Sequence, residues 1–392
     1  MKKYINIGLK IIICILIALN LTSCWSAHEI NKLAIVMGIG IDKGREQGYP
    51  VEMTVQLANV SGIKSSSKNK DGETSNAGYL NLKEKGKSIS DAAKAFNRKL
   101  NRKLFFSHNQ IIILGKDAAE GGIEKYVDFF LRYRETRLLT WVLVSKQPAS
   151  EVLNIKPELE TTPGRNIGEL IKNEKDISQI PSVDLRDFAS KLMSKTTSPI
   201  APIIEVSRDN DKKIAYLSET AVFKKDKMIG TLNKQETRGL LWGINKMKDG
   251  VIVLNTSSDD KINIVTTHSK SRITPKIKDN KPSIKIEIKQ EGDLQEQTFS
   301  EDLANPKAFE IIQKSEEEAI KKEIMLAVKK SQELNSDIFG FGDIIYQHYP
   351  KHWAKMEKEW DEVFRNMSVD VSVNAKLRRT GRITKPIMSK EE

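Results

Sequence analysis

Two histidines near the carboxyl end have a spacing that could bind a metal ion. His348 and His352 lie four residues apart, as two ligands on one face of a helix do. Pro350 lies between them, however, and a proline starts a helix more readily than it continues one. Tyr349 also stands where a metal-dependent hydrolase of this pattern would carry a glutamate. We therefore predict no metal ion at this pair.

Other residues that could do chemistry also lack a catalytic setting. His108 precedes an apolar run, and we interpret it as a hydrogen-bonded structural histidine. No Gly-x-Ser-x-Gly motif occurs in the sequence, so no serine nucleophile of that kind is indicated. Trp242, Trp353 and Trp360 could line a sugar site, but aromatic residues at helical spacing more often belong to a core. The segment 339–343, Phe-Gly-Phe-Gly-Asp, is interpreted as a flexible hinge or a tight turn.

The thiol with the most informative surroundings is that of Cys24. The first ten residues carry three lysines, and Ile11–Leu19 is then apolar without interruption. That run is too short for a stable span, which takes about 20 residues, and it has the length of the apolar part of a signal peptide. An ordinary signal peptide with a cysteine there by chance would show the same two features.

The residues directly before Cys24 favour lipidation. Leu21 lies three residues before the cysteine and Ser23 directly before it, which resembles the lipobox of bacterial lipoproteins. In such proteins the cysteine receives S-diacylglycerol and N-acyl groups and becomes the first residue after cleavage. The resemblance predicts that residues 1–23 are a lipoprotein signal peptide and that Cys24 anchors the chain in a lipid bilayer. Stable anchoring needs more than one acyl chain, which such a cysteine would supply.

Charge and cysteine content limit the remaining possibilities. The chain has a net charge of +12, and removal of residues 1–23, which hold three lysines and no acid, leaves +9. A basic body is attracted to anionic lipid. We predict no nucleic-acid partner, because an export signal argues against one and no basic stripe alternates with stacking aromatics. Cys14 lies within the signal peptide and Cys24 carries lipid, so no disulfide is expected in the mature chain.

The hydrophobic pattern predicts three regions of mixed structure behind the signal peptide. Residues 24–147 form an N-terminal α/β domain, residues 148–210 a smaller and mostly helical region, and residues 211–385 a C-terminal α+β domain. Strands are expected at Leu33–Asp42, Tyr49–Val60, Ile111–Leu114 and Leu138–Ser145. Helices are expected from Ser88 and over 123–131, the second with an apolar face formed by Ile123, Tyr126, Val127, Phe130 and Leu131. Gly38-Ile39-Gly40 lacks the third glycine of a dinucleotide loop and is interpreted as strand.

The C-terminal domain is predicted to be an antiparallel sheet with one long helix. Strand patterns continue to about Gly292, interrupted by a helix at Lys234–Asn245. The long helix begins after Asn305, a suitable cap, with Pro306 in its first turn. Alternating valines at 369–373 close the domain with a strand. The fold class is therefore α+β.

Several segments resemble the Ger(x)C family of spore germination lipoproteins, in order and along nearly the whole mature chain. They are Cys24-Trp25 with Glu29–Asn31 and Leu33–Val36, Phe96–Arg98 with Phe105–Gln110, Glu236–Trp242, Asp337–Gly342, Tyr349–Lys351 with Trp353, and Ala375–Gly381. The family is the C subunit of nutrient germinant receptors. The resemblance implies three domains of mixed helices and sheets, no catalytic activity and no cofactor. It also implies two polytopic membrane subunits as partners and a location on the outer face of the cytoplasmic (inner spore) membrane.

Two functions from different classes follow from these observations. The first is a non-enzymatic lipoprotein subunit of a nutrient germinant receptor, needed for germination in response to small nutrients. The second is a lipid-tethered solute-binding protein of a transporter, which would show two doubly wound lobes around a hinge. A lipoprotein hydrolase is a weaker third reading, because no catalytic triad is found.

Overall fold

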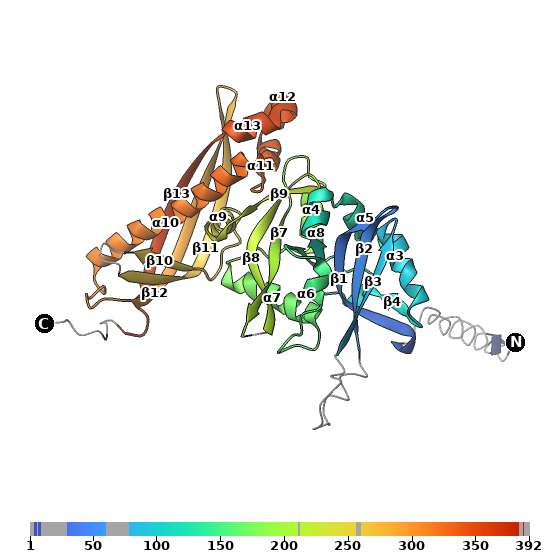
Figure 1. The fold of residues 1–392 in the computed structure, drawn as a ribbon. Coiled ribbons are helices and arrows are strands. Elements are labelled where there is room, and N and C mark those ends of the chain that lie inside the picture. Colours follow the sequence, from blue (N-terminus) through green and yellow to red (C-terminus); the bar gives the residue numbers. More distant parts are fainter. Residues whose placement is uncertain are drawn as a thin grey trace.

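The structure is a computed structural model, and it describes residues 4–5, 7–8, 30–59, 78–210, 212–255, 260–383 and 387. In this part of the chain, helices and strands are mixed and two sheets form, one of nine strands and one of four. The large sheet lies toward the N-terminal side of the molecule and the small sheet toward the C-terminal side (Figure 1). The predicted mixture of helices and sheets is confirmed.

The large sheet has a parallel centre with antiparallel strands on both sides. Strand β1 pairs with β5, β5 with β6 and β6 with β7, all in parallel. The order across the sheet is β3-β2-β1-β5-β6-β7-β8-β9, and β4 pairs in parallel with the first residues of β1. The bounds are β1 (Leu33–Glu46), β2 (Tyr49–Ala58), β3 (Tyr79–Gly86), β4 (Lys103–Phe105), β5 (Ile111–Gly115), β6 (Trp141–Ser145), β7 (Ile200–Asp209), β8 (Lys212–Lys224) and β9 (Lys227–Leu232).

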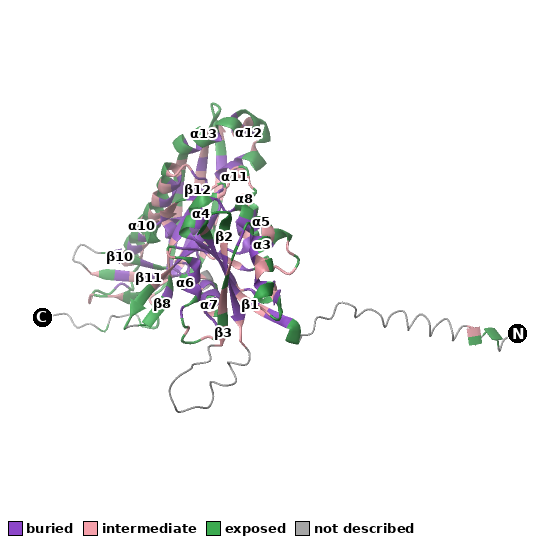
Figure 2. Ribbon diagram, turned by 45° about the vertical axis from the view of Figure 1, so that its right-hand side comes forward, coloured by how far each residue is buried: buried purple, intermediate pink, exposed green. Residues whose placement is uncertain are grey.

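Helices cover both faces of this sheet. Successive side chains of a strand point to opposite faces, so β5 can serve two cores. Ile112 and Leu114 pack in one core with α3 (Ile89–Ala95), α4 (Lys116–Gly121), α5 (Glu124–Arg132) and α8 (Leu185–Leu192). Ile111 and Ile113 pack in the other core with α6 (Ala149–Leu153) and α7 (Pro163–Ile177). Buried residues therefore run through the middle of the molecule (Figure 2).

The small sheet is built from long strands. Strands β10 (Val251–Asn255), β11 (Lys261–Lys278) and β12 (Lys281–Gln297) are antiparallel, and β13 (Ser368–Arg379) joins β12 in parallel. The long helix α10 (Pro306–Glu333) lies along this sheet (Figure 1). Short helices follow it: α11 (Phe341–His348), α12 (Pro350–Met356) and α13 (Trp360–Asn366). The predicted C-terminal sheet with a long helix is confirmed, with β13 as a parallel edge strand.

Helix α10 begins as the sequence predicts. The Asn305 side chain accepts a hydrogen bond from the backbone N–H of Ala308 at 2.9 Å, and Pro306 occupies the first turn, where its missing N–H costs nothing. The face toward the sheet is apolar and buried, as expected, and includes Ile312, Ile320, Ile324 and Val328.

The segment Glu236–Trp242 lies in helix α9 (Lys234–Gly243), where it contacts α10. A side chain at Gly239 would collide with the backbone carbonyl of Glu323 on α10, so the two helices cross closely there. The Glu323 carboxylate accepts from Arg238 Nε at 2.9 Å and from Trp242 Nε1 at 3.0 Å. This segment therefore fixes a helix crossing, and the glycine is needed for the close approach.

The middle region is less separate than its composition suggests. Helices α6, α7 and α8 occupy residues 149–192 as expected, but they pack on the large sheet. Strand β7 follows them and joins β6, whose last residue is Ser145. One residue of the second predicted helix also differs, since Leu131 was expected on the buried face and is 37% exposed. The boundaries at residues 147 and 210 stay a prediction.

Candidate functional site

The predicted lipidation residue lies outside the described residues. Cys24 is six residues before Ile30, at which the continuous description of the chain begins. Its acylation, and the assignment of residues 1–23 as a signal peptide, stay predictions. No helix among the described residues is long and apolar enough to cross a membrane.

The two histidines with metal-ligand spacing are on different helices. His348 ends α11 and its Nδ1 lies 2.9 Å from the Ile344 carbonyl oxygen, whereas His352 lies in α12 next to the Tyr349 ring. The break at Pro350 thus occurs as predicted. Within the described residues, no group of three or more His, Cys, Asp or Glu side chains is placed to hold a metal ion.

The other candidate residues also have structural roles. His108 is exposed, and its ring contacts that of Phe105, with centroids 5.6 Å apart. The sequence had instead led us to expect a hydrogen-bonded side chain at this position. Trp242 is fully buried, and Trp353 and Trp360 lie in the core with ring centroids 5.1 Å apart. The preference for a core role over a sugar site is confirmed for all three tryptophans.

Segment 337–343 forms a tight turn where the part of the chain with the small sheet contacts the part with the large sheet. The buried Asp337 carboxylate accepts backbone hydrogen bonds from Gly340, Phe341 and Gly342 at 2.8–3.0 Å. Burial raises the pKa of Asp337 to about 7, and these three donors oppose the rise. Gly340 has a φ of 78°, which a glycine adopts without strain. The segment was interpreted from the sequence as a flexible hinge or a tight turn, and in the structure it is a tight turn.

Asp343 ties this turn to the segment that leads into β7. Its carboxylate accepts hydrogen bonds from the hydroxyls of Ser194, Thr196 and Thr197 at 2.9, 2.7 and 2.6 Å. The Ser198 N–H also donates to the Asp337 carbonyl at 2.9 Å. The junction therefore joins the large-sheet part to the small-sheet part through a dense set of polar contacts.

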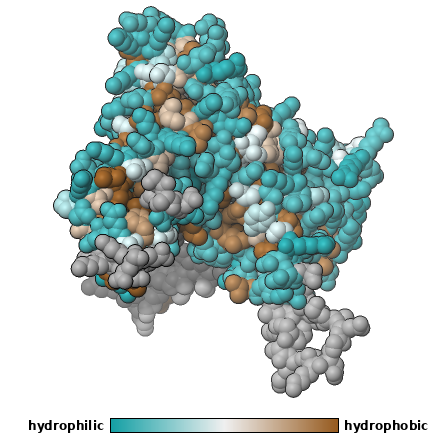
Figure 3. Space-filling model, turned by 60° about the vertical axis from the view of Figure 1, so that its left-hand side comes forward, coloured by the Kyte–Doolittle hydropathy of each residue, from teal (hydrophilic) through white to brown (hydrophobic). Residues whose placement is uncertain are grey.

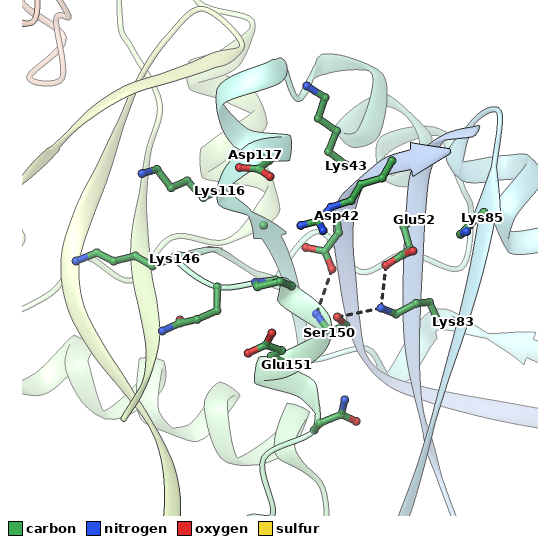
Figure 4. A pocket seen from close by; sticks show the side chains of 15 residues that line it. Asp42, Lys43, Glu52, Lys83, Lys85, Lys116, Asp117, Lys146, Ser150 and Glu151 are labelled. Carbon is green, nitrogen blue, oxygen red and sulfur yellow. Dashed lines mark hydrogen bonds and ion pairs between the residues drawn. The ribbon is translucent and has the colours of Figure 1, made fainter. Parts of the chain in front are cut away.

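A pocket of about 670 Å³ lies at the ends of the parallel strands β1, β5 and β6 (Figure 4). Helix α4 follows β5 toward one face of the sheet, and α6 follows β6 toward the other face, as their separate cores show. Such a divergence between neighbouring strands is a topological switch point. In open α/β sheets, ligands bind in the crevice beyond the carboxyl ends of the strands at this point.

The lining of the pocket is highly charged. It contains six basic and four acidic side chains: Lys43, Arg45, Lys83, Lys85, Lys116, Lys146, Asp42, Glu52, Asp117 and Glu151. Several of the cations are already paired. Lys83 Nζ lies 2.8 Å from Glu52, Lys85 Nζ 2.7 Å from Glu46, and Lys146 Nζ 2.7 Å from Glu205. Lys43 and Arg45 are exposed and form no ion pair with a described residue.

Asp42 lies at the base of the pocket and connects two elements. Its carboxylate accepts backbone hydrogen bonds from Ala149 at 2.8 Å and from Ser150 at 3.2 Å, so it joins β1 to the start of α6. Burial raises the pKa of Asp42 above its ordinary value, although both N–H donors lower it. Gly115 packs against this carboxylate, with no space for a side chain.

Such a pocket can hold a small polar ligand by ionic contacts and hydrogen bonds. Its described lining contains no histidine or cysteine that could act as base or nucleophile. The pocket was not predicted from the sequence, although a signal was present. Asp42, Gly115 and Lys146 stand at the ends of apolar runs predicted as strands, and residues at the carboxyl ends of parallel strands meet at one edge.

Two sequence profiles of one protein family match this chain in succession. The profile "Spore germination protein N-terminal domain" matches residues 26–206, and the profile "Spore germination B3/GerAC like, C-terminal" matches residues 218–381. The chain belongs to the GerAC-like (Ger(x)C) family of spore germination proteins. The first profile includes the pocket, and the second includes α9, α10 and the segment 337–343.

Proteins of Bacillus subtilis are similar over almost their full length. Spore germination protein KC is 26% identical, with 96% of each chain covered. Spore germination protein YndF is 28% identical, with 95% of this chain and 96% of the relative covered. Spore germination protein A3 is 26% identical over 94% of this chain and 97% of the relative. These relatives are all named for spore germination.

A solved structure has the same fold. The crystal structure of the GerBC protein aligns with a TM-score of 0.56 at 17% identity, over 86% of this chain and 97% of that chain. This similarity confirms that the arrangement of mixed helices and sheets is one that a protein of known structure adopts.

Proposed function

We propose that this chain is the membrane-anchored lipoprotein subunit of a nutrient germinant receptor. It is needed for germination in response to small nutrients, and its own role is non-enzymatic. It lies on the outer face of the cytoplasmic (inner spore) membrane, held by acylated Cys24, and it assembles with two polytopic membrane subunits. Both domains of the family are present in order, and this single observation carries the proposal.

The position of Cys24 supports the anchor. The N-terminal family profile begins at residue 26, two residues after the cysteine. An acyl anchor at Cys24 would therefore hold the folded body close to the bilayer without interrupting either family domain. The charged lining of the pocket suits the binding of a small polar ligand.

In such a receptor the anchor supplies effective concentration. A body confined to the membrane surface meets its membrane partners by a local search, so weak contacts suffice. Without the acyl groups, the exported protein would have to find its partners from solution, and raised expression would partly compensate by mass action.

Germination of spores that carry Cys24→Ala tests the proposal. We expect the germination rate with a single nutrient to fall toward that of a deletion strain at normal expression and to recover in part at raised expression. Cys14→Ala is the matched control, because Cys14 lies in the apolar run that is cleaved off with the signal peptide. Spores of the control should germinate as wild type does. Full germination of Cys24→Ala spores at normal expression would contradict the proposal.

The alternative, a tethered solute-binding protein of a transporter, finds less support. It calls for two doubly wound lobes, each with parallel strands and helices on both faces. The small sheet instead has β10, β11 and β12 in antiparallel order, with β13 as its parallel strand. Only the large sheet has the parallel centre expected of such a lobe among the described residues.

A further inference from the structure

We infer that one edge of the large sheet docks on anionic lipid headgroups of the membrane that anchors the chain. We call this surface the basic edge and define it as residues 97–103 and 131–139. The inference rests on the proposed anchor at Cys24 and adds a second, non-covalent contact with the bilayer. That contact would fix the orientation of the body, which a flexible tether alone does not do.

The topology brings the basic edge to the anchored side of the body. Leu33, the first residue of β1, is nine residues after Cys24, and nine extended residues span at most about 30 Å. Strands β4, β5 and β6 run parallel to β1 and therefore begin at the same edge. Residues 97–103 lead into β4, which lies beside the first residues of β1 (Figure 1). Residues 131–139 lead into β6.

Direct contacts join the two segments into one surface. Lys103 Nζ lies 3.1 Å from the Glu135 carboxylate, and the Ser107 hydroxyl donates to the Glu135 carbonyl at 3.1 Å. Beneath them, the rings of Phe106 and Tyr133 pack edge to face with centroids 5.3 Å apart. The two segments thus form a continuous surface.

This surface carries a large positive charge. Seven of its residues are basic and one, Glu135, is acidic: the basic ones are Arg98, Lys99, Arg102, Lys103, Arg132, Arg134 and Arg137. Three of them have acidic partners, namely Lys99 with Glu84, Lys103 with Glu135 and Arg132 with Asp128. The remaining four arginines are exposed and form no ion pair with a described residue. They are therefore free to contact phosphate groups, which arginine binds well.

Exposed leucines accompany the arginines. Leu131, Leu138 and Leu139 have 37%, 46% and 65% of their surface exposed. The turn that presents the last two is well held, because the Leu138 carbonyl accepts from the Arg186 N–H at 3.0 Å and the Thr140 N–H donates to the Arg137 carbonyl at 3.1 Å. Apolar side chains beside cations are the composition that binds at the headgroup boundary of anionic membranes.

Large hydrophobic side chains are also exposed outside the basic edge, among them Leu159, Met193 and Ile311. On the face shown in Figure 3, hydrophilic side chains prevail and hydrophobic ones form separate patches. Docking through the basic edge would turn the opposite edge, with its charged pocket, away from the bilayer. The pocket would then open toward solutes outside the membrane.

Hydrogen–deuterium exchange of the mature, acylated chain in lipid nanodiscs tests the inference. The discs contain phosphatidylcholine either alone or mixed with phosphatidylglycerol. We expect backbone exchange over residues 131–140 to slow in the anionic discs only. The protection should disappear at high salt, because the screening length falls from about 10 Å at 0.1 M to about 3 Å at 1 M.

Two charge reversals with the same change in net charge provide the control. Arg134→Glu with Arg137→Glu should remove the protection, whereas Lys270→Glu with Arg272→Glu, two exposed residues of β11, should keep it. Equal exchange in both kinds of disc would overturn the inference. Protection that appears only with the membrane subunits present would also overturn it, by assigning the edge to a protein contact. The intact mass of the sample reports acylation of Cys24 separately, so failure of the anchor and failure of docking are distinguishable.

Discussion

The two edges of the large sheet use charged residues in different ways. At the basic edge, four arginines are exposed without an ionic partner among the described residues, beside exposed leucines. At the pocket edge, four of the six cations are paired with acidic side chains, and the buried Asp42 is held by backbone N–H groups. The same three parallel strands begin at one edge and end at the other.

The difference separates charges that serve the fold from charges that remain available for a partner. Exposed ion pairs stabilise a protein little, so arginines without partners can be kept or lost with little effect on folding. A buried carboxylate with two backbone donors is different, because its removal leaves those donors unsatisfied. Stability measurements should therefore respond strongly at one edge and weakly at the other.

Substitution of Asp42 should show the largest effect. Asp42→Ala leaves the N–H groups of Ala149 and Ser150 without an acceptor, and we expect the free energy of unfolding to fall by about 3 kcal/mol in a urea titration. Asp42→Asn keeps one acceptor oxygen and should lose less. The matched change at the basic edge, Arg134→Ala, should alter stability by less than about 0.5 kcal/mol. Equal losses at both edges would contradict the comparison.

A buried carboxyl group gives a third case, with an effect that depends on pH. Glu316 on α10 is fully buried, and the buried Gln290 side chain beside it only partly opposes the effect of burial on its pKa. Burial raises the pKa of Glu316 to about 8, so between its ordinary pKa and pH 8 the folded chain holds one proton more than the unfolded chain. Stability contributed by this group therefore falls as the pH rises through that range, by about 1.4 kcal/mol per pH unit.

Glu316→Gln should remove that pH dependence. We expect the free energy of unfolding of the variant to vary less between pH 5 and pH 8 than that of wild type. The two slopes should differ by about 1.4 kcal/mol per pH unit, which corresponds to one bound proton. Glu318→Gln, an exposed residue on the same helix, is the control and should keep the wild-type slope. An unchanged slope in Glu316→Gln would show that the carboxyl group is ionised in the folded chain.

Much of the fold could be predicted from the sequence because its signals are local. A continuous apolar run predicted β1, and the alternation of apolar residues predicted β2 and β13. The pair Asn305 and Pro306 predicted the start of α10. The connection of β7 to β6 depends on contacts between residues 144 and 203, which no local pattern encodes. The exposure of Leu131 was missed for a related reason, since a helical pattern does not show where its covering partner ends.

The candidate site was predicted less well than the fold. Its residues come from β1, β2, β3, β5, α4, α6 and the loop between β6 and α6, and the fold of the large sheet brings them together. In segment 337–343, the glycines correctly indicated a turn, but the partners of Asp343 lie about 150 residues earlier, at 194–197. The assignment of Cys24 rests on a local pattern that is independent of the fold, and it stays a prediction.

The attachment of this chain to a membrane through Cys24 is the central claim, and labelling with palmitate tests it most directly. Cells that express wild type, Cys14→Ala or Cys24→Ala would be labelled and fractionated, with the folded body followed by antibody in each fraction. We predict label and protein in the membrane fraction for wild type and Cys14→Ala, and neither for Cys24→Ala. Equal labelling and equal membrane retention of Cys24→Ala would contradict the account.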